Sequence, residues 1–359
     1  MAARTTVGLD VGTSAVRAAE MSFGRSGATL QRFGQVALPP GAVRDGEVAD
    51  PQLVADALRR LWSGTGFSTK RVVLGVANQR VIVRQVDLPW MPANELRGSL
   101  AMQVQDYLPI PVEQAILDYH PMAEVTEADG ARTIRILIVA ASREMVSNLL
   151  DAVKRAGLRT SRIDLTAFAV LRSLGEVDAL GVNPELHGNA EALVDVGAKV
   201  TNIVVHQNGV PRFVRILPMG GDNVTDAVSE RMGVPFEQAE SVKQELGVSV
   251  GSAPMPVLHP AAGVIDSTAG AFLDEVRGSL AYYATQPGAL QVRRVVLSGG
   301  GGLLPGLGQR LATTVQLPVQ RGSALAAIRV GKTGLGPEQL EAVDSQLAVS
   351  VGLAMAEAS

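Results

Sequence analysis

The stretch Val7-Gly8-Leu9-Asp10-Val11-Gly12-Thr13-Ser14-Ala15-Val16-Arg17 decides the fold, because its pattern returns at Leu193-Val194-Asp195-Val196-Gly197-Ala198-Lys199-Val200-Thr201-Asn202-Ile203. Each copy predicts an apolar strand that ends in Asp-x-Gly, a tight turn of small residues, and a return strand. A carboxylate at the end of a buried strand costs free energy unless it faces a cation or a polar cleft. The glycine allows a backbone or a phosphate to come close. The pair therefore predicts two half-domains that hold one phosphate group and its metal ion from opposite sides.

The elements around the two copies repeat as well. The first copy predicts strands at 5–10, 15–21 and 28–38, and Asp50-Pro51 then opens a helix. The second copy predicts strands at 193–195, 200–206 and 210–217, followed by a helix at 222–232. The same order of elements around the same Asp-Val-Gly core predicts an internal duplication.

Length and composition narrow the class of protein. The 359 residues allow two domains, and a net charge of −3 gives no reason to expect a nucleic-acid partner. Cysteine is absent, which excludes disulfides and thiolate metal sites. The four histidines are scattered without the paired spacing of metal ligands: His120, His187, His206 and His259. We see no signal peptide and no apolar run of the roughly 18 residues that span a bilayer, so we expect a cytoplasmic protein.

The two loops carry groups that suit phosphate and a hydrated magnesium ion. The first offers the Asp10 carboxylate, the Thr13 and Ser14 hydroxyls and the backbone around Gly12. The second repeats the loop, with the amine of Lys199 in place of the hydroxyls. Either loop alone is more often an ordinary hairpin with a satisfied aspartate. The pair favours phosphate binding.

Two further motifs fit a nucleotide. The run Ser298-Gly299-Gly300-Gly301-Gly302 predicts a strand-to-helix turn that a nucleotide can approach closely, although a plain flexible turn is the alternative. Glu240 and Lys243 lie three apart on one predicted helix and so share a face, as solvated surface pairs also do. Gly331-Lys332-Thr333 imitates the end of a P-loop, but Ala326 replaces the required glycine, and 325–330 is better interpreted as a helix. No Gly-x-Gly-x-x-Gly follows the first strand, which disfavours a dinucleotide fold.

A third unit interrupts the first half. Strands at 81–88 and 134–141, a helix at 93–108 and a helix capped by Ser142 predict a small α+β insert, with a hairpin turn at 128–130. We expect the helix at 164–174 to return to the first lobe, the polar segment 175–190 to join the lobes, and a short helix at 347–355 to close the chain. The expected domains are a first lobe of 1–80, 163–190 and 344–359, an insert of 81–162, and a second lobe of 191–343 with a helical subdomain at about 221–290.

Taken in order, these motifs resemble the actin-like ATPase superfamily, which includes actin, the DnaK-type chaperones, sugar kinases and the division protein FtsA. The resemblance implies an α/β, actin-like (ribonuclease H-like) bilobed fold with two duplicated mixed-sheet domains. The similar segments are 7–14 and 195–201 for the two phosphate loops, 298–302 for the adenosine motif, 163–174 and 352–354 for the connecting helices, and 240–243 for Glu-x-x-Lys.

The insert resembles that of the branch that contains FtsA and PilM. Residues 95–119, with Gln103-Val104-Gln105-Asp106-Tyr107-Leu108-Pro109-Ile110-Pro111 and then Leu117-Asp118-Tyr119, are similar to the PilM family of type IV pilus assembly proteins. FtsA ends in a basic amphipathic membrane helix, whereas 354–359 contain no basic or aromatic residue, which favours PilM.

The resemblance implies ATP and Mg²⁺ between the lobes. It assigns the metal, largely through water, to Asp10 and Asp195. It assigns the nucleotide to Gly12, Thr13, Ser14, Gly197, Ala198, Lys199, Gly221, Glu240, Lys243, Gly299, Gly300 and Gly301. Asp164 and Thr166 fall where relatives orient water, and Asp164 is the catalytic candidate, with at most slow ATPase activity expected.

The resemblance also implies a partner. The cytoplasmic N-terminal tail of the membrane protein PilN would dock in a groove near the insert and link the chain to the PilN/PilO inner-membrane complex. Membrane association would then be indirect, at the inner face of the cytoplasmic membrane, and self-association stays open. The alternatives are an FtsA-like filament-forming division protein and a small-molecule kinase or phosphatase on the same fold.

Overall fold

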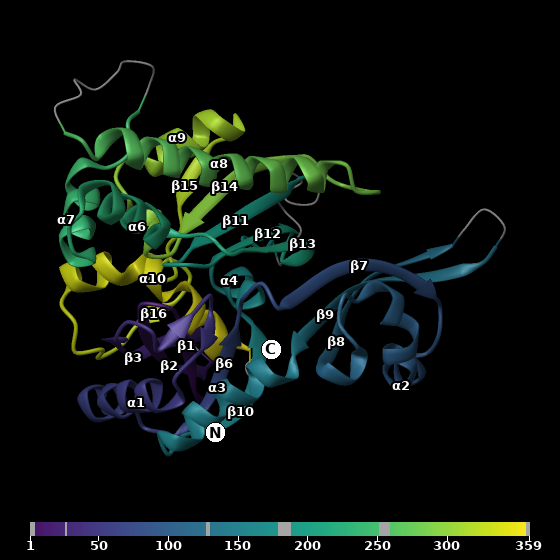
Figure 1. Ribbon diagram of the computed structural model, residues 1–359. Coiled ribbons are helices and arrows are strands. Elements are labelled where there is room, and N and C mark those ends of the chain that lie inside the picture. The colour runs from purple at the N-terminus through teal and green to yellow at the C-terminus, as the bar shows by residue number, and fades with distance from the viewer. Residues whose placement is uncertain (1–3, 26, 127–129, 179–187, 251–258, 357–359) are drawn as a thin grey trace.

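Two mixed β-sheets form the centres of two lobes, and a small α+β insert projects from the first lobe (Figure 1). The computed structural model describes residues 4–25, 27–126, 130–178, 188–250 and 259–356. The strands of the first sheet are β1 (Arg4–Val11), β2 (Ala15–Gly24), β3 (Gly27–Ala37), β6 (Arg71–Val76), β10 (Arg159–Leu165) and β16 (Arg329–Val330). Those of the second are β11 (Ala190–Val196), β12 (Thr201–Gln207), β13 (Val210–Leu217), β14 (Val292–Ser298) and β15 (Val319–Arg321).

The two sheets have equivalent topologies. Their strand orders are β10-β6-β1-β2-β3-β16 and β15-β14-β11-β12-β13. In each lobe the central strand, β1 or β11, pairs antiparallel with the strand that follows it and parallel with β6 or β14. This equivalence confirms the duplication that the repeated motif predicts.

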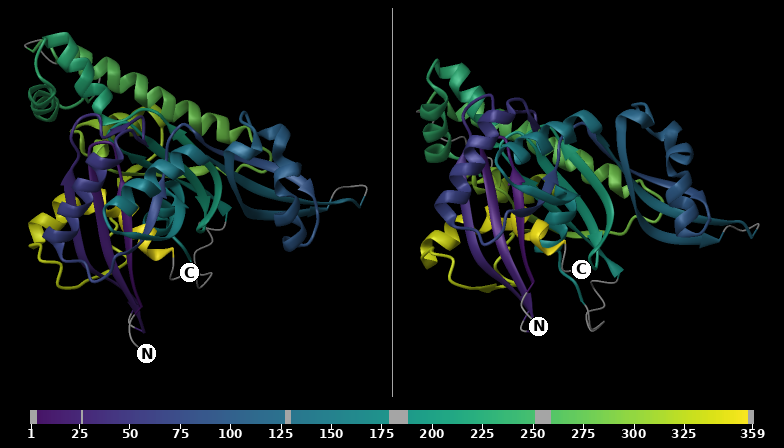
Figure 2. Two further views of the ribbon diagram at one scale, coloured as in Figure 1. Left: turned by 60° about the horizontal axis from the view of Figure 1, so that its bottom comes forward. Right: turned by 90° about the horizontal axis from the view of Figure 1, so that it is seen from below.

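Helices cover both faces of each sheet. The first lobe has α1 (Pro51–Thr65), α3 (Arg143–Arg155), α4 (Thr166–Leu174) and α10 (Pro337–Met355). The second has α6 (Gly221–Met232), α7 (Phe236–Leu246), α8 (Ala262–Ala284), the short η3 (Gly301–Leu303) and α9 (Leu307–Val315). The helices α6, α7 and α8 lie within the expected helical subdomain, and α8 runs along one side of the second lobe (Figure 2).

The helices α4 and α10 pack between the two sheets and join the lobes. One hydrophobic core contains Val7 of β1, Val170 of α4 and Val204 of β12. A Cβ at Gly352 of α10 would lie 1.8 Å from the carbonyl oxygen of Ala169, so only glycine permits the two helices to come this close.

The start of α1 illustrates how local sequence sets an element. The Asp50 side chain accepts hydrogen bonds from the backbone N–H groups of Gln52 and Leu53, and Pro51 occupies the first helical position. Gly66, in the left-handed region with φ of 70°, ends the helix. The buried face of α1 then covers the outer side of β2 and β3.

The insert is a three-stranded sheet with one helix. Its strands are β7 (Val81–Pro89), β8 (Ala115–Thr126) and β9 (Arg132–Ser142), in the order β7-β9-β8, and its helix is α2 (Ala93–Val104). The short helices η1 (Gln105–Tyr107) and η2 (Val112–Gln114) lead into β8, and a small hairpin of β4 (Val43–Arg44) and β5 (Glu47–Val48) belongs to the first lobe. Leu96 and Leu100 of α2 pack on Ile136 and Ile138 of β9 and give the insert its own core.

The structure differs from the expected elements in several places. The strand β10 occupies 159–165, so the helix expected from residue 164 begins only at Thr166. The segment 325–330 is not a helix, because Arg329 and Val330 add an edge strand to β3. The closing helix begins at Pro337 instead of 347, with proline at its first turn. The expected turn at 128–130 lies mostly outside the described residues.

The carboxyl end of the insert also differs. The helix α3 packs on α1, and β10 pairs with β6, so residues 143–162 belong to the first lobe and not to the insert. The boundary expected at residue 162 therefore lies about twenty residues too far along the chain. The strand β10 forms the parallel edge of the first sheet, and its mostly polar sequence contains no continuous apolar run that would predict a strand.

Candidate functional site

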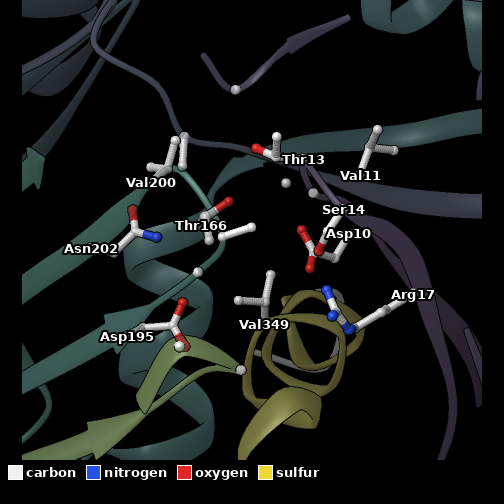
Figure 3. A pocket seen from close by; sticks show the side chains of 18 of the residues that line it. Asp10, Val11, Thr13, Ser14, Arg17, Thr166, Asp195, Val200, Asn202 and Val349 are labelled. Atoms are coloured by element: carbon white, nitrogen blue, oxygen red, sulfur yellow. The ribbon is translucent and has the colours of Figure 1, made fainter. Parts of the chain in front are cut away.

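The two Asp-x-Gly turns have the same geometry and face one cavity. The N–H of Gly12 donates to the carbonyl oxygen of Ala15 at 3.0 Å, and that of Gly197 to Val200 at 2.9 Å. Asp10 and Asp195 lie on opposite sides of a cavity of about 270 Å³, with α10 between them (Figure 3). The equivalent loops therefore meet across the cleft between the lobes, as the repeat predicts.

Most of the predicted site residues line this cavity. They are Asp10, Gly12, Thr13, Ser14, Asp195, Gly197, Ala198, Gly221, Glu240, Lys243, Gly300 and Gly301. Thr166, at the start of α4, lines it as well. The cavity also includes side chains that we did not select from the sequence, namely Arg17, Asn202 and Asp222.

Arg17 and Asn202 occupy equivalent positions in the two lobes. Arg17 of β2 lies opposite Asp10, and Asn202 of β12 lies opposite Asp195. Both follow their aspartate by seven residues, and this equal spacing in the two copies of the motif could have identified them from the sequence. The Arg17 guanidinium points toward Asp10 and donates to Gln346 at 3.3 Å (Figure 3). Its Nε and the Asn202 Oδ1 are buried without a hydrogen-bond partner, so both are available to a ligand.

The environment of the two aspartates disfavours their ionised forms. Burial raises the pKa of Asp10 from 3.8 to about 6, against the opposing effect of Arg17 and with a further rise from Asp195. Burial also raises the pKa of Asp195, although the Ser298 hydroxyl donates to its Oδ1 at 2.8 Å. Two carboxylates share one guanidinium, so the cleft favours an added cation.

Glycines permit the close packing of the second loop. A Cβ at Gly220 would lie 2.4 Å from the carbonyl oxygen of Gly197, and one at Gly301 would lie 2.8 Å from the same oxygen. Gly299 has φ of 82° and packs on the backbone of Val196. Of the glycine run, Gly300 and Gly301 thus face the cavity, whereas Gly299 makes the turn beneath it.

The Glu-x-x-Lys pair is tied into the wall of the cavity. The Lys243 amine, in a buried side chain, donates to Glu240 at 2.6 Å, to Thr225 at 2.9 Å and to the Gly221 carbonyl at 3.2 Å. Burial alone would raise the pKa of Glu240, but hydrogen bonds from Lys243 and Thr225 hold it below its usual range. Lys243 therefore fixes the positions of Gly221 and Glu240, and Glu240 stays an ionised acceptor.

Besides Gly299, two predicted residues are absent from the cavity wall. Lys199 forms an ion pair with Asp226 of α6 and is absent from the cavity lining. Asp164 pairs with Arg172 of α4 and lines a different cavity. The chain changes from strand β10 to helix α4 between Leu165 and Thr166. Asp164 therefore lines the other cavity, whereas Thr166 lines the cavity between the lobes.

This second cavity, of about 640 Å³, lies between the insert and the first lobe. The insert contributes residues of α2, β8 and β9, and the first lobe contributes β10 and α4. Its walls combine apolar and charged side chains, including Ile116, Tyr119, Phe168, Arg97, Arg162, Arg172 and Asp118. The arrangement suits a peptide that offers both apolar and charged groups.

The described part of the chain has neither a preformed metal cluster nor a membrane-spanning helix. Within the ranges given above, no group of three or more His, Cys, Asp or Glu side chains could by itself hold a metal ion. None of the helices in those same ranges combines the length and hydrophobicity of a membrane span.

Solved structures with a similar fold support this architecture. The structure described as "PilM-PilN type IV pilus biogenesis complex" aligns with a TM-score of 0.82 and 26% identity over 98% of this chain and 97% of that one. The ADP-bound MreB5 of Spiroplasma citri aligns with a TM-score of 0.53 and 14% identity over 97% and 94% of the two chains, which shows the actin-like fold.

Sequence relatives include cell division proteins. FtsA of Bacillus subtilis (strain 168) is 25% identical over 264 residues, which cover 67% of this chain and 58% of FtsA. FtsA of Escherichia coli (strain K12) is 27% identical over 146 residues, which cover 40% of this chain and 33% of FtsA. The chain thus aligns with less than two thirds of the length of these relatives.

A family model extends over almost the whole sequence. It is described as "Type IV pilus assembly protein PilM" and matches residues 8–358. The match includes both Asp-x-Gly loops, the insert and the glycine run. The chain therefore belongs to the PilM family of type IV pilus assembly proteins.

Proposed function

We propose that this chain is a nucleotide-binding scaffold of type IV pilus assembly, which holds Mg²⁺-ATP between its lobes and the tail of a PilN-type membrane protein beside its insert. The observation that carries the proposal is the cavity between two equivalent Asp-x-Gly loops, which Asp10, Asp195 and Arg17 line together.

The donors around the cavity fit a triphosphate. The guanidinium of Arg17 and the hydroxyls of Thr13 and Ser14 would bind phosphate oxygens. Gly12 and Gly197 use their N–H groups to close the turns, so they would contribute the space that a side chain would fill. Asp10 and Asp195 would repel phosphate unless a divalent cation lay between them.

The residues also fit a hydrated magnesium ion. Asp10 and Asp195 would hold it mostly through water, and the unpaired Asn202 Oδ1 is a further oxygen acceptor for such water. The ion would neutralise the phosphate charge. On the nucleoside side, ionised Glu240 would accept hydrogen bonds from ribose hydroxyls, and Gly300 and Gly301 would leave room for the base.

We propose that ATP acts chiefly as a ligand that sets the relation of the two lobes. Asp164, the catalytic candidate, pairs with Arg172 in the other cavity, and Thr166 offers the cleft only a hydroxyl. A hydroxyl is a poor general base at neutral pH. Bound ATP can still favour a closed arrangement of the lobes, provided that it binds that arrangement more tightly.

We propose the second cavity as the groove for the partner's tail. Its position between two structural units and its mixed apolar and charged walls suit an extended peptide. The similar solved structure is a PilM-PilN complex, which is why we choose this partner. The proposed location, at the inner face of the cytoplasmic membrane, follows from such a partner.

Three experiments test the proposal. Mass spectrometry of the purified chain should identify co-purified adenine nucleotide, and calorimetry should show Mg²⁺-dependent ATP binding that Asp195→Ala weakens.

A pull-down with a PilN-type tail peptide should succeed with ATP present and fail with Ile116→Asp in the groove. Val330→Asp is the matched control, because Val330 is 44% exposed against 39% for Ile116 and lies at the opposite edge of the first lobe. Rapid, substrate-dependent ATP consumption would overturn the scaffold in favour of an enzyme.

A further inference from the structure

Cations gather on one face of the first lobe. The segments 56–72 and 151–160 contain seven exposed Lys and Arg residues and only two carboxylates, in a chain whose net charge is −3. We call this the basic face, and its cations are Arg59, Arg60, Lys70, Arg71, Lys154, Arg155 and Arg159. The carboxylates, Asp56 and Asp151, pair with Arg59 and Arg155. The two segments therefore carry a net charge of +5.

Backbone contacts join these residues into one surface. The Arg59 guanidinium donates to the carbonyl oxygen of Arg155 at 2.8 Å, which links the middle of α1 to the carboxyl end of α3. The N–H of Arg159 donates to the carbonyl oxygen of Lys70 at 2.8 Å, and Arg159 lies opposite Arg71 in the sheet. The elements α1, α3 and β10 lie together on the side of the first lobe where the N-terminus emerges (Figure 1).

Helix stabilisation does not account for the whole surface. Lys154 and Arg155 lie in the last turn of α3, where cations interact favourably with the helix dipole. Lys70, Arg71 and Arg159, in contrast, lie outside the helices, directly before or at the starts of β6 and β10. A concentration of like charge on a folded surface costs free energy through repulsion, which an anionic partner relieves.

We propose that the basic face binds the anionic phospholipid headgroups of a membrane surface. Its position supports this occupant, since β10 leads from Arg159 on this face to Arg162 and Leu165, which line the groove beside the insert. A partner tail that runs from that groove to a membrane would bring the same membrane to this face. This step alone rests on the proposed function. Bases of a nucleic acid would find no free aromatic ring here, because Trp62 and Phe67 are partly buried and pack on each other at 4.8 Å.

Vesicle sedimentation with the full chain tests the proposal. The wild-type protein should bind vesicles that contain phosphatidylglycerol and should not bind vesicles of phosphatidylcholine alone. It should dissociate from the anionic vesicles at high salt. Each Lys or Arg near an anionic surface strengthens binding by about fivefold. The triple variant Arg60→Gln, Lys70→Gln and Lys154→Gln should therefore bind about 100-fold more weakly.

A charge-matched triple variant supplies the control. Arg231→Gln, Arg329→Gln and Lys332→Gln remove three exposed cations from α6 and from the opposite edge of the first sheet, and should bind as wild type does. Equal loss in both triples, or no binding of wild type to anionic vesicles, would overturn the proposal. Binding of wild type to a DNA or RNA duplex but not to vesicles would also overturn it. Failure of ATP or tail-peptide binding with vesicle binding intact would contradict the proposed function instead.

Discussion

Replacing Asp10 with asparagine should abolish Mg²⁺-ATP binding and yet stabilise the free protein. Burial raises the pKa of Asp10 from 3.8 to about 6, so the ionised side chain opposes folding at neutral pH. That change in pKa corresponds to at most about 3 kcal/mol in the free energy of unfolding. The stability that this group contributes is complete below pH 3.8 and is lost as the pH rises through about 6. Asp10→Asn should therefore exceed wild type above pH 6 and match it near pH 4.

Urea unfolding of ligand-free protein across this pH range measures the difference, with exposed Asp106→Asn as the control. Adding Mg²⁺-ATP at about 100 times its Kd should stabilise wild type by about 2.7 kcal/mol and leave Asp10→Asn unchanged. The reasoning would be refuted if Asp10→Asn were no more stable than wild type at pH 7.5, or if its advantage persisted at pH 4.

Further expectations concern the cleft and the helix crossing. Because a protonated Asp10 cannot hold Mg²⁺, ATP affinity should fall about tenfold from pH 7 to pH 5, and a flat calorimetric profile would contradict this. Arg17→Met should weaken ATP binding by about 10- to 100-fold, because a charge-assisted contact to phosphate is lost. The control Lys199→Met breaks only the ion pair with Asp226 and should change ATP affinity by less than about twofold. Gly352→Ala should lower the free energy of unfolding by about 1–3 kcal/mol, because its Cβ meets the Ala169 carbonyl, whereas Gly278→Ala, with open space around it in α8, should not destabilise the protein.

The repeated motif predicted the central part of the fold because it encodes both position and chemistry. Asp-x-Gly specifies a strand end and a turn, and its second occurrence, within the same order of elements along the chain, predicted a second sheet; the structure shows that the two sheets also share their strand order. The insert was visible through its apolar strand β9 and its helix α2. The edge strands β8 and β10 were not predicted, because exposed and polar residues interrupt any continuous apolar run in them.

The sequence predicted those site residues whose positions the backbone turns fix. It did not predict the positions of long side chains that can reach more than one partner. The glycines and aspartates of the two loops line the cavity, since the turn itself fixes their positions. Lys199 is long enough to reach Asp226 of α6 instead of the cleft. Arg17 was overlooked because only the antiparallel register of β1 and β2 brings it opposite Asp10.

Calorimetric titration of the full chain with ATP, in the presence of Mg²⁺ and again in EDTA, tests the central claim most directly. Two carboxylates on opposite sides of one cavity predict a single site that binds ATP more weakly without the metal and more weakly in Asp195→Asn. Absence of binding by the folded protein, or binding that is indifferent to both Mg²⁺ and Asp195, would contradict it.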